Sequence, residues 1–109
     1  MSEAQQYLYQ IRPTRIAILT EGPTPREADL VAQHFAYLEN LLRLGVVILA
    51  GRTLTKDDET FGTVIFKAQN EQEALTIMRN DPAVEHGVMT ARLYPYQVFL
   101  VCEANAAVS

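Results

Sequence analysis

The sequence predicts an α+β domain with the element order strand, helix, strand, strand, helix, strand. Three observations support this class. An amphipathic segment at 25–44 carries helix start and stop signals, a second helical segment follows Asn70, and apolar runs bounded by polar turns flank both. The 109 residues suffice for one domain (1–109), with a core expected at about 7–102 and a tail at 103–109.

The first strand is predicted over Tyr7–Leu19, a stretch rich in β-branched and aromatic residues. Pro13 has no N–H to donate to a ladder, so we expect a break or bulge at that position. Arg15–Leu19 is then the firmer half of the strand. A loop containing Gly22 and Pro23 follows it.

The first helix carries the clearest local signals in the chain. Thr24 is the expected N-cap, Pro25 stands at the first helical position, and Glu27 completes a capping box. Gly45 suits the left-handed position just past the last turn. The stripe predicted to face the core recurs at intervals of three and four and consists of Leu30, His34, Tyr37, Leu38, Leu41 and Leu42.

A hairpin is predicted after this helix. Val46–Ala50 is a continuous apolar run, so both faces of that strand are expected to be covered. Thr53–Thr60 is a polar, charged turn, and Phe61–Lys67 is the next strand. The short separation predicts antiparallel pairing between the two strands.

A second helix and a last strand complete the pattern. Asn70 is the expected N-cap, with Glu73 at the capping-box position, and the Asp81-Pro82 pair ends the helix. A short turn or single helical turn leads into the last strand, predicted over Val88–Val101 with a break at Pro95. This order gives a ferredoxin-like sheet of four antiparallel strands with two helices on one face. The bare face calls for a second sheet, so we expect a homodimer or a higher homo-oligomer.

Composition excludes several classes of partner. The net charge is −4 and the basic residues are scattered, so the chain lacks the basic stripe that binds nucleic acid, and an anionic membrane would repel it. Neither a signal peptide nor an apolar run of about 20 residues is present, and we expect a cytoplasmic location. Cys102, the single cysteine, excludes an internal disulfide and is expected in the last strand.

Three segments in this order and spacing resemble the YciI-like family of the dimeric α+β barrel superfamily. They are HFAYL at 34–38, GVVILAG at 45–51, and Asp81-Pro82 followed by Gly87. The resemblance implies a dimer of ferredoxin-like protomers with a pocket between sheet and helices. It also implies that His34 and Asp81 form an acid/base pair. The chain departs from the family pattern in its longer first strand and in Ala83-Val84, where an aromatic residue is frequent.

The paired residues make chemical sense, although each has a purely structural alternative. An imidazole can take and return a proton near neutral pH, and a carboxylate on one ring nitrogen fixes the tautomer. The alternative for His34 is a buried histidine bonded to a backbone carbonyl. For Asp81 the alternative is a local turn before proline. His86 is expected to be a solvated loop residue.

Four further residues are candidates for binding a substrate. Gly51 permits a bulge or a close approach of the backbone to a ligand, and Arg52 could hold an anionic group. Arg15, in the predicted first strand, is a second anion-binding candidate. Tyr94 shares a strand face with Tyr96 and could line a pocket, or both could belong to the core or a dimer interface.

The leading hypothesis is an enzyme with His34 as base and Asp81 as its orienting partner, a lyase or isomerase acting on a small polar or aromatic compound. We expect no cofactor, since no glycine motif cradles a phosphate, and no metal, since the acidic run at 57–59 lacks calcium-loop periodicity. One alternative is a non-catalytic dimeric module that binds a metabolite. Another is a monooxygenase, cofactor-free or haem-dependent, of the same superfamily.

Overall fold

The structure, a computed structural model, describes residues 4–102 and confirms the α+β, ferredoxin-like prediction. Its four strands form one antiparallel sheet in the order β2-β3-β1-β4. The elements in chain order are β1 (Gln5–Pro13), α1 (Ala17–Thr20), α2 (Pro25–Arg43), β2 (Val47–Arg52), β3 (Gly62–Ala68), α3 (Glu71–Arg79), α4 (Pro82–Glu85) and β4 (Met89–Tyr96).

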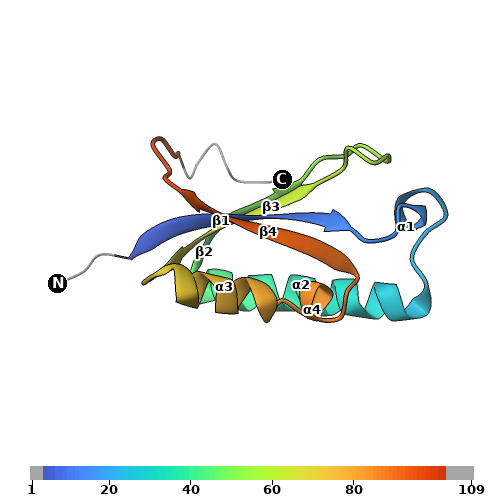
Figure 1. Ribbon diagram of the computed structural model, residues 1–109, viewed down its shortest axis with the longest axis horizontal. Helices are drawn as coiled ribbons and strands as arrows, with labels where there is room; N and C mark the ends of the chain where they lie inside the picture. Colours follow the sequence, from blue (N-terminus) through green and yellow to red (C-terminus); the bar gives the residue numbers. More distant parts are fainter. Residues whose placement is uncertain (1–3, 103–109) are drawn as a thin grey trace.

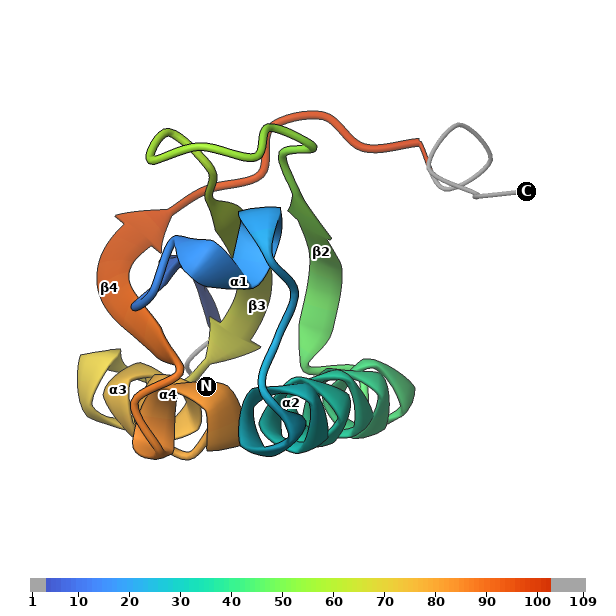
Figure 2. The same ribbon diagram turned by 90° about the vertical axis from the view of Figure 1, so that its right-hand side faces the viewer.

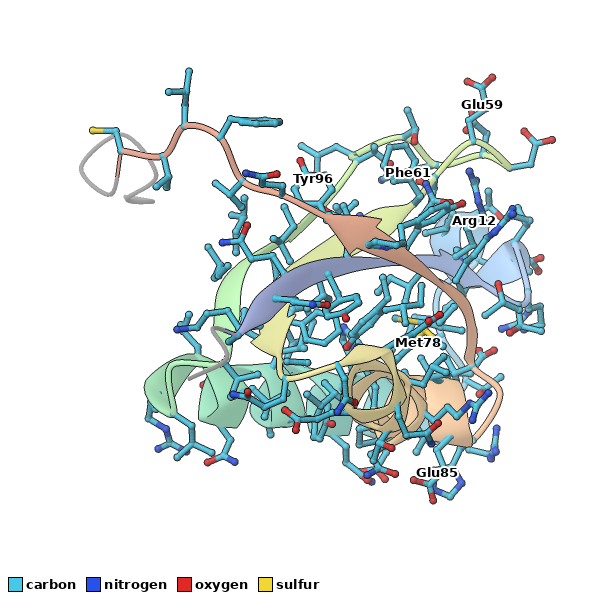
Figure 3. The ribbon with its side chains drawn as sticks, turned by 60° about the vertical axis from the view of Figure 1, so that its left-hand side comes forward. Arg12, Glu59, Phe61, Met78, Glu85 and Tyr96 are labelled. Carbon is cyan, nitrogen blue, oxygen red and sulfur yellow. The ribbon has the colours of Figure 1, made fainter. Side chains whose placement is uncertain are left out.

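One face of the sheet is covered by α2, α3 and α4, and the other carries no helix among the described residues (Figure 1). The main buried cluster lies between the sheet and these helices and contains Tyr7, Tyr9, Ile11, Leu38, Val47, Val64, Phe66, Ala68, Ala74 and Met78. Figure 3 shows Met78 in this layer and Tyr96 on the helix-free side. Alternate residues of each strand therefore meet the helices, as the two-residue period of a strand requires.

Helix α2 begins and ends as the sequence predicts. The Thr24 hydroxyl accepts from Glu27 N–H, and the Thr24 N–H donates to the Glu27 carboxylate at 2.8 Å, which completes the capping box. Gly45 has a φ of +77°, the left-handed conformation expected after the last turn. The stripe buries Leu30, His34 and Leu38. Inclusion of Leu42 was wrong, since 54% of that residue is exposed.

The first strand was predicted too far along the chain. β1 ends at Pro13, and Arg15–Leu19 forms a turn and the short helix α1, not the firmer half of a strand. The two neighbouring strands do not extend past this point. Ile11 pairs with Gly62, the first residue of β3, and Pro13 pairs with Met89, the first residue of β4. No partner strand remains, so Ile18 packs in a second buried cluster beside α2 and α4. Figure 2 shows α1 across this end of the sheet.

The hairpin and the second helix follow the prediction. β2 and β3 pair antiparallel, with a register irregularity between Val47 and Leu49. The Asn70 side chain caps α3 by accepting from Glu73 N–H at 2.9 Å. The single helical turn expected before the last strand is α4, which Asp81 caps by accepting from Ala83 N–H.

Apolar side chains are exposed on the helix-free face of the sheet. We expected both faces of the apolar run at Val46–Ala50 to be covered, and in the single chain the helix-free face is not. Leu49, Ile65, Leu8 and Tyr94 are paired residues on successive strands and form one row across this face. Leu49 is 51% exposed and Tyr94 is 36% exposed. Leu49 and Tyr94, at the two ends of the row, are its most exposed members, whereas Ile65 is buried.

The last strand is shorter than predicted and is not broken at its proline. β4 runs through Pro95 to Tyr96, because it is an edge strand, where a residue without an N–H is tolerated. Residues 97–102 are not in a strand, and Cys102 is exposed, contrary to the prediction that it lies in the last strand. The tail predicted at 103–109 lies outside the described residues.

Candidate functional site

A histidine and an aspartate from distant parts of the sequence meet beneath the sheet. His34 Nδ1 lies 2.8 Å from Asp81 Oδ1 and 2.7 Å from Oδ2. His34 is 4% exposed and Asp81 is fully buried. The periodicity of α2 turns His34 inward, and the N-cap position of α4 presents Asp81 to it. His34 is bonded to a carboxylate, so the alternative of a histidine bonded to a backbone carbonyl was wrong.

Both oxygens of Asp81 already accept other hydrogen bonds. Ala83 N–H donates to Oδ1 at 3.1 Å, and the Tyr9 hydroxyl donates to Oδ2 at 2.8 Å. A carboxylate acting as an acceptor on both oxygens requires the proton of the shared bond to be on His34 Nδ1. The geometry thus assigns the tautomer of the neutral ring in which Nε2 is the unprotonated nitrogen.

His34 Nε2 is open to the space beside the pair. Within residues 4–102, no buried side-chain nitrogen or oxygen lacks a hydrogen-bond partner. His34 Nε2 makes no hydrogen bond in the structure, so this atom must keep access to the cavity that His34 lines. One ring nitrogen is therefore held by Asp81, and the other can be reached from the cavity.

Tyr9 is a member of this cluster that the sequence analysis missed. Burial raises the pKa of Tyr9 above its ordinary value, and the charge of Asp81 and the hydrogen bond to it raise that pKa further. The available signal was its inward position in β1 between Tyr7 and Ile11, because a buried tyrosine hydroxyl needs a partner. Burial, with the charge of Asp81, also raises the pKa of Tyr37 to about 12. The Tyr37 hydroxyl donates to the backbone oxygen of Ile77.

The cavity beside His34 has a volume of about 720 Å³ and lies between α1, α2 and the adjoining ends of β1, β2 and β3. Most of its lining is apolar, as in Ile11, Ile18, Val31, Phe35, Leu42 and Met89. Its charged or titratable lining residues are Arg12, His34, Glu39 and Arg52. A small-molecule site has this composition, with an apolar wall and a few placed polar groups.

Two of the four substrate-binding candidates line this cavity. Gly51 and Arg52 do so at the end of β2, and a Cβ added at Gly51 would meet no protein atom within 4 Å. Arg15 lies outside β1 and the cavity lining, and its guanidinium bonds to the Glu27 carboxylate at 2.6 and 3.0 Å. That hydrogen bond lowers the pKa of Glu27 to about 2. Tyr94 belongs to the row on the helix-free face.

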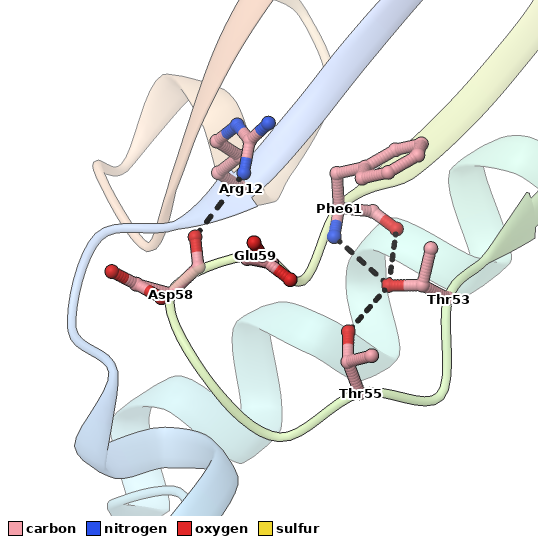
Figure 4. A pocket seen from close by; sticks show the side chains of 6 residues that line it. All are labelled: Arg12, Thr53, Thr55, Asp58, Glu59 and Phe61. Carbon is pink, nitrogen blue, oxygen red and sulfur yellow. Dashed lines mark hydrogen bonds between the residues drawn. The ribbon is translucent and has the colours of Figure 1, made fainter.

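A second, open hollow of about 540 Å³ lies at the β2–β3 loop (Figure 4). Arg12 donates to the backbone oxygens of Asp58 and Thr60, and its guanidinium stands 5.6 Å from the centre of the Phe61 ring. The hydroxyls of Thr53 and Thr55 bond to each other at 3.0 Å. These contacts brace the predicted polar turn. In the described part of the chain, no three His, Cys, Asp or Glu side chains come together as metal ligands.

Comparison with known proteins identifies relatives of this fold. The sequence model of the YCII-related domain matches residues 7–95. The structure is similar to 5-chloro-2-hydroxyhydroquinone dehydrochlorinase (TftG) from Burkholderia phenoliruptrix AC1100 in complex with 2,5-dihydroxybenzoquinone. The TM-score is 0.59 at 23% identity, over 84% of this chain and 93% of that one.

A second similar structure is the uncharacterized protein TM1266 from Thermotoga maritima. Its TM-score is 0.55 at 10% identity, over 87% of this chain and 100% of the other. At such identities both likenesses establish the fold alone. No curated protein matches the chain. No helix within residues 4–102 is long and apolar enough to cross a membrane.

Proposed function

The chain belongs to the YCII-related domain family, and we propose that it is a cofactor-independent enzyme, a lyase or isomerase acting on a small polar or aromatic compound. The observation that carries the proposal is the asymmetry of His34, whose Nδ1 is held by a buried carboxylate while Nε2 is open to an apolar cavity. A general base needs both features, a fixed ring and a free nitrogen.

In the proposed step, His34 Nε2 removes a proton from the bound compound. In an isomerisation the proton leaves a carbon beside a carbonyl, and the electron pair of the broken C–H bond moves into that carbonyl. In an elimination from a chlorinated hydroxyhydroquinone the proton leaves a ring hydroxyl, the carbon that carries chlorine takes up a proton, and loss of a second hydroxyl proton then expels chloride and leaves a hydroxyquinone. Asp81 accepts the Nδ1–H bond and stabilises the imidazolium that forms. In an isomerisation Nε2 returns the proton to another carbon of the substrate, and in an elimination it passes the proton to water.

The comparison with TftG supports the elimination form of the proposal. The name of that protein describes removal of hydrogen chloride from a chlorinated hydroxyhydroquinone, and its structure holds a dihydroxybenzoquinone. Loss of a proton with chloride is a reaction that one placed base can serve. Such a base typically contributes about 10²–10⁴-fold to a rate.

The direct test replaces His34 by asparagine. The asparagine side-chain nitrogen can occupy the place of Nδ1, so His34→Asn retains a donor for Asp81 and loses only Nε2. We expect chloride release from 5-chloro-2-hydroxyhydroquinone to fall by about 100-fold or more, with a melting temperature close to that of the wild type. His86→Asn, a change at an exposed histidine, is the matched control and retains the rate.

Equal rates in the wild type and His34→Asn would refute the role of His34. No turnover by the wild type with this probe or with a panel of substituted hydroquinones and quinones would refute the elimination. That result would favour the non-catalytic binding module.

We also propose that two copies pair through the helix-free face of the sheet. The row of Leu49, Ile65, Leu8 and Tyr94 is apolar and leaves Leu49 and Tyr94 exposed at its ends, and closed two-fold dimers are the commonest way to bury such a face. Sedimentation equilibrium is expected to give a dimer at micromolar concentration. Leu49→Asp should shift it toward monomer, and a monomeric wild type would refute the pairing.

A further inference from the structure

The charge of the cavity lining is opposite in sign to that of the whole chain. The chain has a formal net charge of −4, whereas the charged lining of the cavity consists of Arg12 and Arg52 against one carboxylate, Glu39. A cleft with apolar walls and an excess of one sign of charge concentrates ligands of the other sign. An excess of cations in an acidic protein is therefore a feature of the cavity and not of the general surface.

Of the two arginines, Arg52 is the one available to a ligand. Arg12 is occupied by the backbone oxygens of the β2–β3 loop and by the Phe61 ring (Figure 4). Arg52 makes one side-chain hydrogen bond, a 3.3 Å contact from Nη1 to the backbone oxygen of Thr53. Among residues 4–102, no carboxylate forms an ion pair with Arg52. Most of the guanidinium donors of this exposed side chain are thus free.

The register of the sheet sets Arg52 on the same face as the catalytic candidates. Arg52 pairs with Gly62, and Gly62 pairs with Ile11, so the three form one row across β2, β3 and β1. Tyr9, two residues before Ile11 on the same face of β1, donates to Asp81. Two strand spacings, about 10 Å, separate the backbones of Arg52 and Ile11. A side chain reaching inward from Arg52 and the ring of His34 therefore line the same cavity from different walls.

The remaining walls offer apolar surface for the body of a ligand. Phe35 and Leu42 line the cavity and each is 54% exposed, although both are large apolar side chains. Gly62 has no side chain, and Ile11 fills that space, since a Cβ added there would lie 3.0 Å from Ile11 Cγ1. The part of the floor that Ile11 and Gly62 form between Arg52 and His34 is consequently apolar.

We propose that this cavity takes an amphipathic anion, a compound with an apolar ring and an ionised oxygen group that pairs with the free guanidinium of Arg52. The apolar ring packs against the wall that includes Phe35. The reacting carbon of the ring then faces His34 Nε2, and this placement rests on the proposed function. Binding of the anion by Arg52 does not require His34. A carboxylate can accept two parallel hydrogen bonds from a guanidinium, which fixes the orientation of the ring, whereas a phenolate pairs with the guanidinium through its single oxygen.

The test measures binding and not turnover, so it is independent of the identity of the substrate. Benzoate and benzamide have nearly the same shape and differ in charge, and their dissociation constants are measured by calorimetry on the wild type, Arg52→Gln and Arg79→Gln. Arg79→Gln removes the same charge from the exposed end of α3, away from the cavity. We expect the wild type to bind benzoate more tightly than benzamide, and Arg52→Gln to lose about 10- to 100-fold in affinity for benzoate alone.

Each outcome bears on the proposal. Arg79→Gln should match the wild type, and Arg52→Lys should recover part of the affinity, because it restores the charge without the paired donors. The proposal is overturned by unchanged benzoate affinity in Arg52→Gln, by equal affinity of the wild type for both compounds, or by no binding of benzoate. His34→Asn should still bind benzoate. If that variant keeps its turnover, the proposed function fails while the anion site remains.

Discussion

The two histidines of this chain are each beside a carboxylate, yet their settings differ. His34 meets Asp81 at 2.7 Å with side chains that are 5% and 0% exposed. His86 lies 3.8 Å from Glu85, its neighbour in sequence, with side chains that are 51% and 56% exposed. Adjacency in the sequence produced the weak pair and tertiary packing produced the strong one. A site is therefore defined by burial and by further partners, and not by the presence of an acid beside a histidine.

The buried pair, His34 and Asp81, should stabilise the fold more than the exposed pair, His86 and Glu85. An exposed ion pair contributes about 0–1 kcal/mol, because water screens the charges and ordering the side chains costs entropy. Removing one partner of a buried pair costs about 3–5 kcal/mol, because the other partner is left without compensation. Asp81 has two additional donors, Tyr9 and the Ala83 N–H, so three groups depend on its carboxylate.

The largest expected effect is that of Asp81→Ala. This change leaves the Tyr9 hydroxyl, the Ala83 N–H and His34 Nδ1 without their acceptor in a buried region, and the free energy of unfolding should fall by about 3–5 kcal/mol. Urea denaturation followed by circular dichroism measures it. Glu85→Ala, which removes the acid of the exposed pair, is the control and should change stability by less than about 0.5 kcal/mol. Similar losses in both variants would abolish the distinction between the pairs.

A smaller effect is expected at alkaline pH. An unfolded tyrosine has a pKa of 10.0, and folding raises the pKa of Tyr9 above that value. The contribution of the protonated Tyr9 hydroxyl to the free energy of unfolding is therefore fully present below pH 10. It is lost as the pH rises toward the pKa of the folded state. At about pH 11 the loss from Tyr9 is on the order of 1 kcal/mol. Unfolding free energies between pH 9 and 11 measure the slope.

The control for this slope is Tyr9→Phe. That variant should be less stable than the wild type at neutral pH, because Asp81 loses a donor, but its stability should fall less steeply above pH 10. The raised pKa of Tyr37, about 12, remains in both proteins and cancels from the comparison. Parallel slopes would show that the Tyr9 hydroxyl is not coupled to folding.

Local signals in the sequence predicted one half of the candidate site. The capping residues fixed the start of α2, and its periodicity then turned His34 inward. Asp81 was predicted either as a turn residue before proline or as the partner of His34. It fills both roles, because its carboxylate caps α4 and also forms a hydrogen bond with His34. Their contact could not be derived from residues 47 positions apart without the topology that joins α2 to α4.

The errors of the sequence analysis have a common physical cause. Arg15–Leu19 has the composition of a strand, but the sheet provides no neighbour beyond Pro13, and packing on α2 decides its conformation. Tyr9 was overlooked because an inward tyrosine in a strand has the same pattern as any core aromatic residue. In both places a partner distant in sequence, and not the local residue type, determines the structure.

The smallest expected effect concerns the exposed pair, His86 and Glu85. His86→Asn should change the free energy of unfolding by less than about 0.5 kcal/mol at neutral pH, because the ring is half exposed and its distance to Glu85 exceeds that of a hydrogen bond. Arg26 donates to the backbone oxygen of residue 86, a contact that the substitution keeps. Denaturation of His86→Asn beside His34→Leu, which removes both the ring and the donor for Asp81, measures the difference. A loss at His86 as large as that at His34 would mean that the distance and burial of the pairs do not determine their energies.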